Sequence, residues 1–250
     1  MELAASKFEF EQRFWIIGFI FWIGFGFYRF DDTNVAQALL HWIAPSMNPD
    51  GDRGMLLLRL LFAGGAMLVF LAALLRTWAT AYLRTEVVHD AAQHSEALLA
   101  DGPYRYVRNP LYLANLPMAV GVGMLASRLG FVFMVLAMLA FMYRLIFREE
   151  AGLIQTQGQS YRAYLKAVPR LWPSRVPRVP SAGRQPKWGA AFAAEAFIWL
   201  FGVAVLSFAI TLNFKRTCIL FAASLGIYFI AVYIVKKRAA AALTKSPQPR

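Results

Sequence analysis

Long apolar runs separated by short polar segments dominate the hydrophobic pattern of this chain. A helix that spans a membrane needs about 17–25 mostly apolar residues, and six segments approach or meet that length. They are residues 14–30, 55–75, 110–127, 129–143, 190–214 and 217–235. Continuous apolar runs replace the alternation expected of a strand barrel. The pattern therefore predicts an all-α polytopic membrane protein with about six transmembrane helices.

Composition and charge support this class of protein and orient it. The 250 residues are 59% hydrophobic, and the mean hydropathy of +0.47 is too high for an ordinary water-soluble domain. Most of the 26 lysines and arginines fall on one side if both termini are cytoplasmic, as expected for loops that are not translocated. The net charge of +12 thus indicates topology and attraction to anionic lipid headgroups, not nucleic-acid binding.

Loop composition divides the chain into four parts. Residues 1–75 are an N-terminal transmembrane hairpin whose external loop, 31–53, holds a short apolar patch expected to form an interfacial helix. Residues 76–175 form the core that carries the motifs below. Residues 176–189 are rich in proline and basic residues, which is typical of an extended cytoplasmic linker. Residues 190–250 are a C-terminal transmembrane hairpin with a basic tail.

The segment GPYRYVRNPLY at 102–112 begins the third apolar run. A residue before proline is disfavoured in a helix, and proline suits the first helical turn, so the helix is predicted to start at Asn109-Pro110. Its free N–H groups and positive dipole end favour a carboxylate or phosphate. Arg105 and Arg108 stand just before that end. Either they assist an anion site or they contact lipid headgroups.

Two adjacent acids, Glu149 and Glu150, follow the fourth apolar run, after Arg144 and Arg148 have already interrupted it. A helix C-terminus disfavours carboxylates, and a charge held at membrane depth costs up to about 2.5–3.5 kcal/mol. A cation must therefore compensate them. The two arginines on the same helix are one candidate, and the ammonium group of a bound ligand is the other.

The third and fourth runs are joined by only a few residues around Arg128, so they must be antiparallel. The Asn109 end of one helix then lies beside the Glu149 end of the other. A ligand that carries both a carboxylate and an ammonium group would fit between these ends. Gly121 and Gly123, in the middle of the third run, are interpreted as close helix packing rather than as a nucleotide loop.

The motifs in 76–173 resemble those of integral-membrane isoprenylcysteine carboxyl methyltransferases and phospholipid N-methyltransferases. The family's Arg-(His or Asn)-Pro-x-Tyr motif corresponds to residues 108–112, and its paired glutamates correspond to Glu149-Glu150. Later family positions correspond to Tyr161, Tyr164 and the Val-Pro-Arg of 168–170. Asn109 replaces the histidine of the carboxyl methyltransferases, and Ala114 occupies a position where glycine is common. The resemblance therefore leaves the methyl acceptor open.

The resemblance implies a cytoplasmic S-adenosylmethionine pocket formed by the third and fourth spans and the following segment. It implies a lipophilic small-molecule or lipid acceptor, such as a prenylcysteine-type carboxylate or a lipid amine. The cofactor-binding residues implied are Arg105, Tyr106, Asn109, Pro110, Tyr112, Glu149, Glu150, Tyr161 and Tyr164. The catalytic residues implied are Glu150 and Arg170, where Arg170 shapes the lid and orients the acceptor. The resemblance implies no metal.

Three alternatives accompany this interpretation. Membrane sterol reductases share the proline-x-tyrosine helix start and use a nicotinamide phosphate cofactor, but paired acids repel such a nucleotide. A catalytically silent membrane scaffold needs only the spans. Glu86, Asp90 and His94 have helical spacing, with His89 beside them, yet a solvated amphipathic helix explains them more simply than a metal site. The sequence does not indicate an oligomeric state, and the single Cys218 cannot form an internal disulfide.

Overall fold

A computed structural model describes residues 3–83 and 101–243. Every regular element in this part of the chain is a helix, and the β-bridge between Asn34 and Ser127 belongs to no strand. The elements are α1 (Lys7–Glu11), α2 (Arg13–Gly26), η1 (Phe27–Arg29), α3 (Val35–Ile43), α4 (Asp52–Tyr82), η2 (Gly102–Arg105), α5 (Pro110–Gly123), α6 (Arg128–Ala167), α7 (Trp188–Ala194), α8 (Ala196–Thr211) and α9 (Phe214–Leu243). The predicted all-α class is confirmed for these residues.

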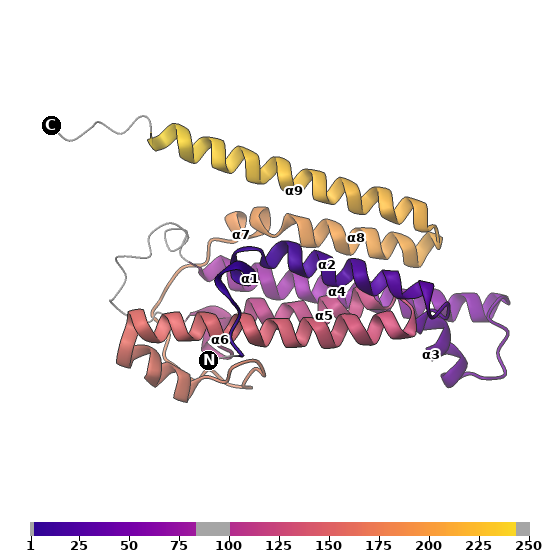
Figure 1. Cartoon of the computed structure of the whole chain (residues 1–250), viewed down its shortest axis with the longest axis horizontal. Helices are drawn as coiled ribbons and strands as arrows, with labels where there is room; N and C mark the ends of the chain where they lie inside the picture. Colours follow the sequence, from indigo (N-terminus) through magenta and orange to yellow (C-terminus); the bar gives the residue numbers. More distant parts are fainter. Residues whose placement is uncertain (1–2, 84–100, 244–250) are drawn as a thin grey trace.

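The long helices lie side by side in one elongated bundle (Figure 1). Helix α4 packs against α5 and α8, α6 packs against α2 and α5, and α9 lies along α8 at the edge of the bundle. The main apolar cluster takes most of its side chains from α4, α5 and α8. Gly65 and Gly121 meet where α4 and α5 cross, and a Cβ on either glycine would collide with the carbonyl oxygen of the other. The prediction that Gly121 serves close helix packing is thus confirmed.

Two described helices, α4 and α6, are long and apolar enough to cross a membrane, each with a best-window mean hydropathy of 2.2. Helices α7 and α8 meet at a 58° bend and supply a third span if they are counted together. Helices α2 and α5 have 14 residues each, which is short for a span on their own. Two spans, or three with the bent pair, are therefore supported among the described residues, and the count of six stays a prediction.

Helix α6 continues well beyond the apolar run that predicted it. It reaches Ala167 and is interrupted at Gly158, whose φ of 56° and ψ of −125° suit a residue without a Cβ. After this break the last part of the helix folds back, so that Tyr161 and Tyr164 pack against Leu153 of the earlier turns. Figure 1 shows this fold at the end of α6. Because of this break, the end of α6 and the residues after it lie against residues 102–112.

The predicted helix in the 31–53 loop is α3, and residues just before it bind the turn that joins α5 to α6. We call residues 124–128 the distal turn, because they lie at the opposite end of α5 from Asn109. The carboxylate of Asp31 accepts hydrogen bonds from the Arg128 guanidinium at 2.9 Å and from Leu129 N at 3.0 Å. Asn34 donates from its side chain to Ala126 O at 3.1 Å. The loop therefore closes the distal end of the hairpin with polar contacts.

The C-terminal helices pack against the core through α4. Glu195, buried at the bend between α7 and α8, accepts a hydrogen bond from Arg76 Nε at 2.6 Å and another from Thr80 Oγ1 at 2.8 Å. Trp199 Nε1 donates to Thr77 Oγ1 at 3.0 Å. These contacts hold the last third of α4 against the bend between α7 and α8.

Candidate functional site

Helix α5 begins at Pro110, as the sequence predicts, with Asn109 in the N-cap position. The side chain of Asn109 does not cap the helix. Its amide instead donates to Glu150 Oε1 at 3.2 Å and to the carbonyl oxygen of Arg170 at 3.0 Å. The first N–H groups of α5 therefore donate no hydrogen bond to this side chain, and the positive end of the helix dipole remains available to an anion.

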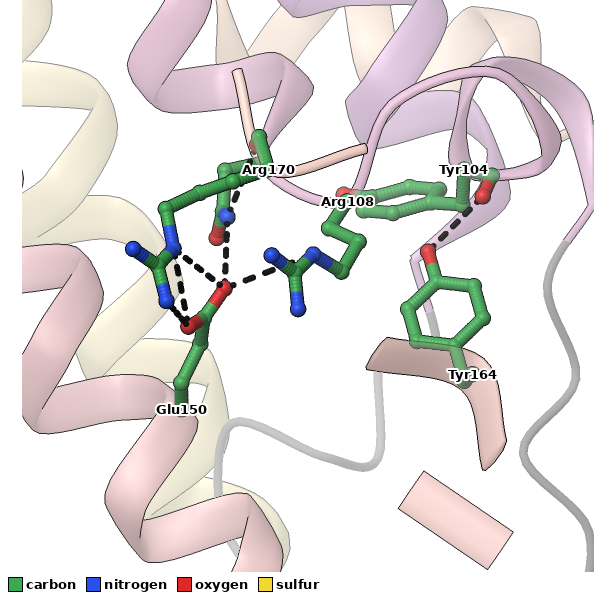
Figure 2. Close-up of polar contacts among 6 residues, drawn as sticks. Tyr104, Arg108, Glu150, Tyr164 and Arg170 are labelled. Carbon is green, nitrogen blue, oxygen red and sulfur yellow. Dashed lines mark hydrogen bonds and ion pairs between the residues drawn. The ribbon is translucent and has the colours of Figure 1, made fainter. Parts of the chain in front are cut away.

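Glu150 is the centre of a buried polar cluster (Figure 2). It is 4% exposed, and its Oε2 accepts hydrogen bonds from Arg170 Nε at 3.1 Å and from Arg170 Nη2 at 2.9 Å. Its Oε1 lies 3.5 Å from Nε of Arg108. Hydrogen bonds between a guanidinium and a carboxylate are charge-assisted, so they are stronger than those between neutral groups. Three chain segments, 108–109, the middle of α6 and the residues after it, thus meet at one carboxylate.

The cluster has more positive than negative charge. Arg108 and Arg170 share the single carboxylate of Glu150. The side chain of Arg108 is only 8% exposed, and its buried Nε has no hydrogen-bond partner. Buried donors without a partner are rare in folded proteins and call for an explanation. An anion bound near Arg108 and the start of α5 would supply one.

Glu149 lies in a different environment from its neighbour. It is exposed and forms no ion pair with any residue that the structure describes. The Tyr112 hydroxyl is a hydrogen-bonding neighbour of its carboxylate, and Arg13 acts on it from beyond ion-pair distance. Of the two adjacent acids, Glu150 is therefore satisfied within the protein and Glu149 is open to a cation from outside.

The arginines on α6 do not compensate the two acids, which was one of the two alternatives left by the sequence. Arg144 pairs with Glu9 at 2.9 Å, and Arg148 donates to the carbonyl oxygen of Ala5 at 3.0 Å. Both partners belong to the N-terminal segment, in which Glu9 completes a capping box with Ser6 at the start of α1. The two arginines nearest to Glu149 in the sequence are therefore bound to the N-terminal segment and not to Glu149.

The folded-back end of α6 covers η2 with aromatic side chains. The Tyr164 hydroxyl donates to the carbonyl oxygen of Tyr104 at 2.7 Å (Figure 2), and the ring centroids of Tyr161 and Tyr164 are 5.8 Å apart. Val168 and Val179 complete this small apolar cluster. Burial raises the pKa of the Tyr104 hydroxyl above its ordinary value, so the group stays protonated at neutral pH. The tyrosines fix the segment that leads into the site.

The structure brings together only part of the predicted set of site residues. Asn109, Glu150 and Arg170 are in direct contact. Arg105 and Tyr106 lie before the cluster, and the Arg105 side chain donates to Val179 O at 2.9 Å rather than toward Glu150. Pro110 is buried at the helix start, and Tyr112 lies beside Glu149.

Arg108 was one of the two arginines for which the sequence left an anion site open, but it was not among the cofactor-binding residues that the resemblance implied. Its position before a helix N-terminus is the signal that pointed to it. Glu86, His89, Asp90 and His94, the residues considered for a metal, lie outside the described residues. Within 3–83 and 101–243, no group of three or more His, Cys, Asp and Glu side chains is placed to hold a metal ion.

Comparison with known proteins gives a family for the segment that holds this cluster. The phospholipid methyltransferase family matches residues 60–160, which confirms for this segment the resemblance expected from its motifs. The match runs from α4 through η2 and α5 into α6. It includes Arg108, Asn109 and both glutamates, and it ends before Arg170.

Two curated proteins are similar to the chain. The cobalt-zinc-cadmium resistance protein CzcN of Cupriavidus metallidurans is 26% identical over 149 residues, which are 60% of this chain and 56% of the relative. The nickel-cobalt-cadmium resistance protein NccN of Alcaligenes xylosoxydans xylosoxydans is 26% identical over 109 residues, 44% of this chain and 48% of the relative. The chain therefore spans about half the length of these relatives. No solved structure matches it.

Proposed function

We propose that this chain, whose residues 60–160 match the phospholipid methyltransferase family, is an integral-membrane S-adenosylmethionine-dependent methyltransferase with a lipophilic acceptor. One observation carries the proposal beyond the family match. Just before α5, the buried Nε of Arg108 makes no hydrogen bond and lies 3.5 Å from Glu150, a carboxylate that it shares with Arg170, while the adjacent turn of α6 presents a carboxylate without an ion-pair partner, Glu149. Opposite charges on one small ligand would satisfy both.

The methionine end of S-adenosylmethionine carries a carboxylate and an ammonium group on the same carbon atom. Arg108 and the free N–H groups of α5 are suited to the carboxylate, since a helix N-terminus favours an anion. Glu149 is suited to the ammonium group, and Tyr112 lies beside it as a further polar contact. The residues present therefore fit this cofactor, which supplies an electrophilic methyl group when bound.

Glu150 and Arg170 have positioning roles in this proposal. Glu150 holds Asn109, Arg108 and Arg170 together, so that the start of α5 and the segment after α6 keep a fixed geometry. The side chain of Arg170 is 37% exposed. It donates hydrogen bonds to Glu150 from Nε and Nη2, which leaves Nη1 free to orient an acceptor. Methyl transfer depends mainly on alignment and exclusion of water. The folded-back part of α6, with Tyr161 and Tyr164, provides that cover.

The proposal includes six spans, with both termini and the site on the cytoplasmic side and a lipophilic acceptor that enters the site sideways from the bilayer. The segregation of basic residues supports this topology. A cysteine introduced at exposed Gln185, in a background with Cys218→Ser, tests it. We expect no reaction with a membrane-impermeant maleimide in intact cells and ready reaction after permeabilisation. Labelling in intact cells would overturn the topology.

Cofactor binding separates the methyltransferase from its rivals. The experiment titrates S-adenosylmethionine, S-adenosylhomocysteine and NADPH into the detergent-purified chain by calorimetry. The proposal predicts micromolar binding of the first two and none of NADPH. Binding of NADPH alone would favour a sterol-reductase-like enzyme, and no binding of any of the three would favour a scaffold. Either result would overturn the proposal.

A further inference from the structure

The proline-rich segment after the site is hydrogen bonded to the protein along its length. We call residues 174–184 the strap. Its backbone lies beside residues 101–106, which contain η2. The contacts are Ser174 N to Tyr106 O at 2.9 Å, Arg178 N to Arg105 O at 2.8 Å, and Arg105 Nε to Val179 O at 2.9 Å. The sequence predicted an extended linker here, and the strap is a bound extended segment.

A buried carboxylate fastens the far end of the strap. Asp101 is 2% exposed and accepts hydrogen bonds from the Ser181 hydroxyl, from Ala182 N at 3.0 Å and from Arg184 N at 3.0 Å. The chain can converge on one carboxylate because Gly183 adopts a φ of 76°, which favours glycine. Burial alone would raise the pKa of Asp101, but these hydrogen bonds outweigh it and hold the pKa below its ordinary value. The contacts are therefore charge-assisted and strong.

The two segments joined by the strap are the same two that meet at Glu150. Residues 101–109 run from Asp101 through η2 to Asn109, and the strap follows Arg170 after a few residues. Closer to the site, Arg108 N donates to Pro169 O at 2.9 Å. A continuous series of hydrogen bonds thus extends from Asp101 to the Glu150 cluster.

We infer that Asp101 is a positioning residue of the cofactor site, which acts by holding the strap against residues 101–106 and so fixing how Arg108 and Arg170 meet Glu150. The inference rests on the proposed function. It assigns a role in binding to residues 174–184, which lie outside the part of the chain that matches the family. Coupling between two sites is reciprocal, so the bound cofactor must also stabilise the strap.

The test compares Asp101→Asn with Asp31→Asn in the full chain in detergent. Asp31 is a matched control because it is also buried, at 7% exposed, and also accepts backbone and side-chain hydrogen bonds, but at the distal turn. We expect Asp101→Asn to weaken S-adenosylhomocysteine binding at least tenfold by calorimetry. Asp31→Asn should change it less than twofold, even where both variants lower the midpoint of thermal unfolding.

A second pair of variants keeps the test decisive if Asp101→Asn does not fold. Ser181→Ala removes one of the three donors to Asp101, whereas Ser181→Thr keeps the hydroxyl. We expect weaker binding in the alanine variant and rescue in the threonine variant. Hydrogen exchange of residues 174–184 should slow when S-adenosylhomocysteine is added to the unmodified chain.

Three results would contradict the inference or its basis. Unchanged binding in both Asp101→Asn and Ser181→Ala would overturn the inference while leaving the proposed function intact. Equal losses in Asp101→Asn and Asp31→Asn would show a general loss of structure and would also overturn it. An unmodified chain that binds no S-adenosylhomocysteine would overturn the proposed function and this inference with it.

Discussion

The two ends of the α5–α6 hairpin differ in how their charges are balanced. At the distal turn one acid meets one cation, because Asp31 binds the Arg128 guanidinium and also accepts the N–H of Leu129. At the other end Glu150 serves two arginines, while Glu149 beside it has no ion-pair partner among the described residues. The charges at the distal end are therefore balanced within the protein. The unbalanced end has the charge distribution expected of a binding site.

Two asparagines show the same contrast. Asn34 precedes α3 and caps it, since its side-chain oxygen accepts from Ala36 N at 2.8 Å. Asn109 precedes α5 and leaves it uncapped, because its amide is committed to Glu150 and Arg170. The helix that begins at the candidate site thus forgoes a stabilising cap, which leaves its N–H groups to a ligand.

The largest expected effect is the loss of stability in Glu150→Gln. The change leaves Arg108 buried without its counter-ion, and breaking a buried pair costs about 3–5 kcal/mol. We expect about 3 kcal/mol, because Arg170 is partly exposed and can find water. Thermal unfolding measures the loss, with Glu11→Gln as the control, since its exposed pair with Lys7 contributes little. Equal unfolding midpoints in the two variants would contradict the cluster's structural role.

Glu149→Gln should affect binding rather than stability. Loss of a hydrogen bond to a charged ligand group costs about 1.5–3 kcal/mol. We therefore expect affinity for S-adenosylhomocysteine to fall by that amount in calorimetry, with the unfolding midpoint close to that of the unmodified chain. Unchanged affinity would remove Glu149 from the site and would make the imbalance at this end accidental.

The asparagine pair sharpens the comparison with a smaller effect. Asn34→Ala should cost about 1 kcal/mol of stability through the lost cap and leave cofactor affinity within twofold. Asn109→Ala removes no cap, so the free energy of cofactor binding that it loses should exceed the free energy of unfolding that it loses. Calorimetry and thermal unfolding of both variants give the two values. If Asn34→Ala and Asn109→Ala lost the same affinity, the claim that only the Asn109 end of the hairpin binds the cofactor would be contradicted.

The last prediction concerns stability at low pH, where Glu9 becomes protonated. Hydrogen bonds from the Arg144 guanidinium and from Ser6 N lower the pKa of Glu9 from 4.5 to about 2. A lowered pKa in the folded state stabilises the protein above the unfolded pKa, and this contribution is lost as the pH falls toward 2. Unfolding midpoints measured between pH 5 and pH 2 should fall less steeply in Glu9→Gln than in the unmodified chain. Identical slopes would contradict the Glu9–Arg144 pair.

Local patterns predicted the features that depend on neighbouring residues. The proline after Asn109 fixed the start of α5, and the short connection at the distal turn required an antiparallel hairpin. The expected proximity of the Asn109 and Glu149 ends is confirmed by the 3.2 Å contact between Asn109 and Glu150. The loop helix at 35–43 and the packing role of Gly121 were also predicted.

Features that depend on distant contacts were missed. Helix α6 continues past its apolar run, and its arginines are engaged by the N-terminal segment, as in the pair between Arg144 and Glu9. Asp101 and Ser181 are likewise far apart in sequence, so the composition of the linker indicated only an extended chain. Propensity describes each segment alone, whereas the choice of ion-pair partner is made by the folded chain.

Methyl transfer itself tests the central claim most directly. Membranes that contain the chain, or its Glu149→Gln variant, are incubated with S-adenosylmethionine labelled in the methyl group, and lipids are extracted. The account predicts label in the lipid fraction with the unmodified chain and much less with the variant. Release of labelled methanol by alkali would identify a carboxylate acceptor, and alkali-stable label would identify an amine. Lipids without label above that of membranes lacking the chain would contradict the account.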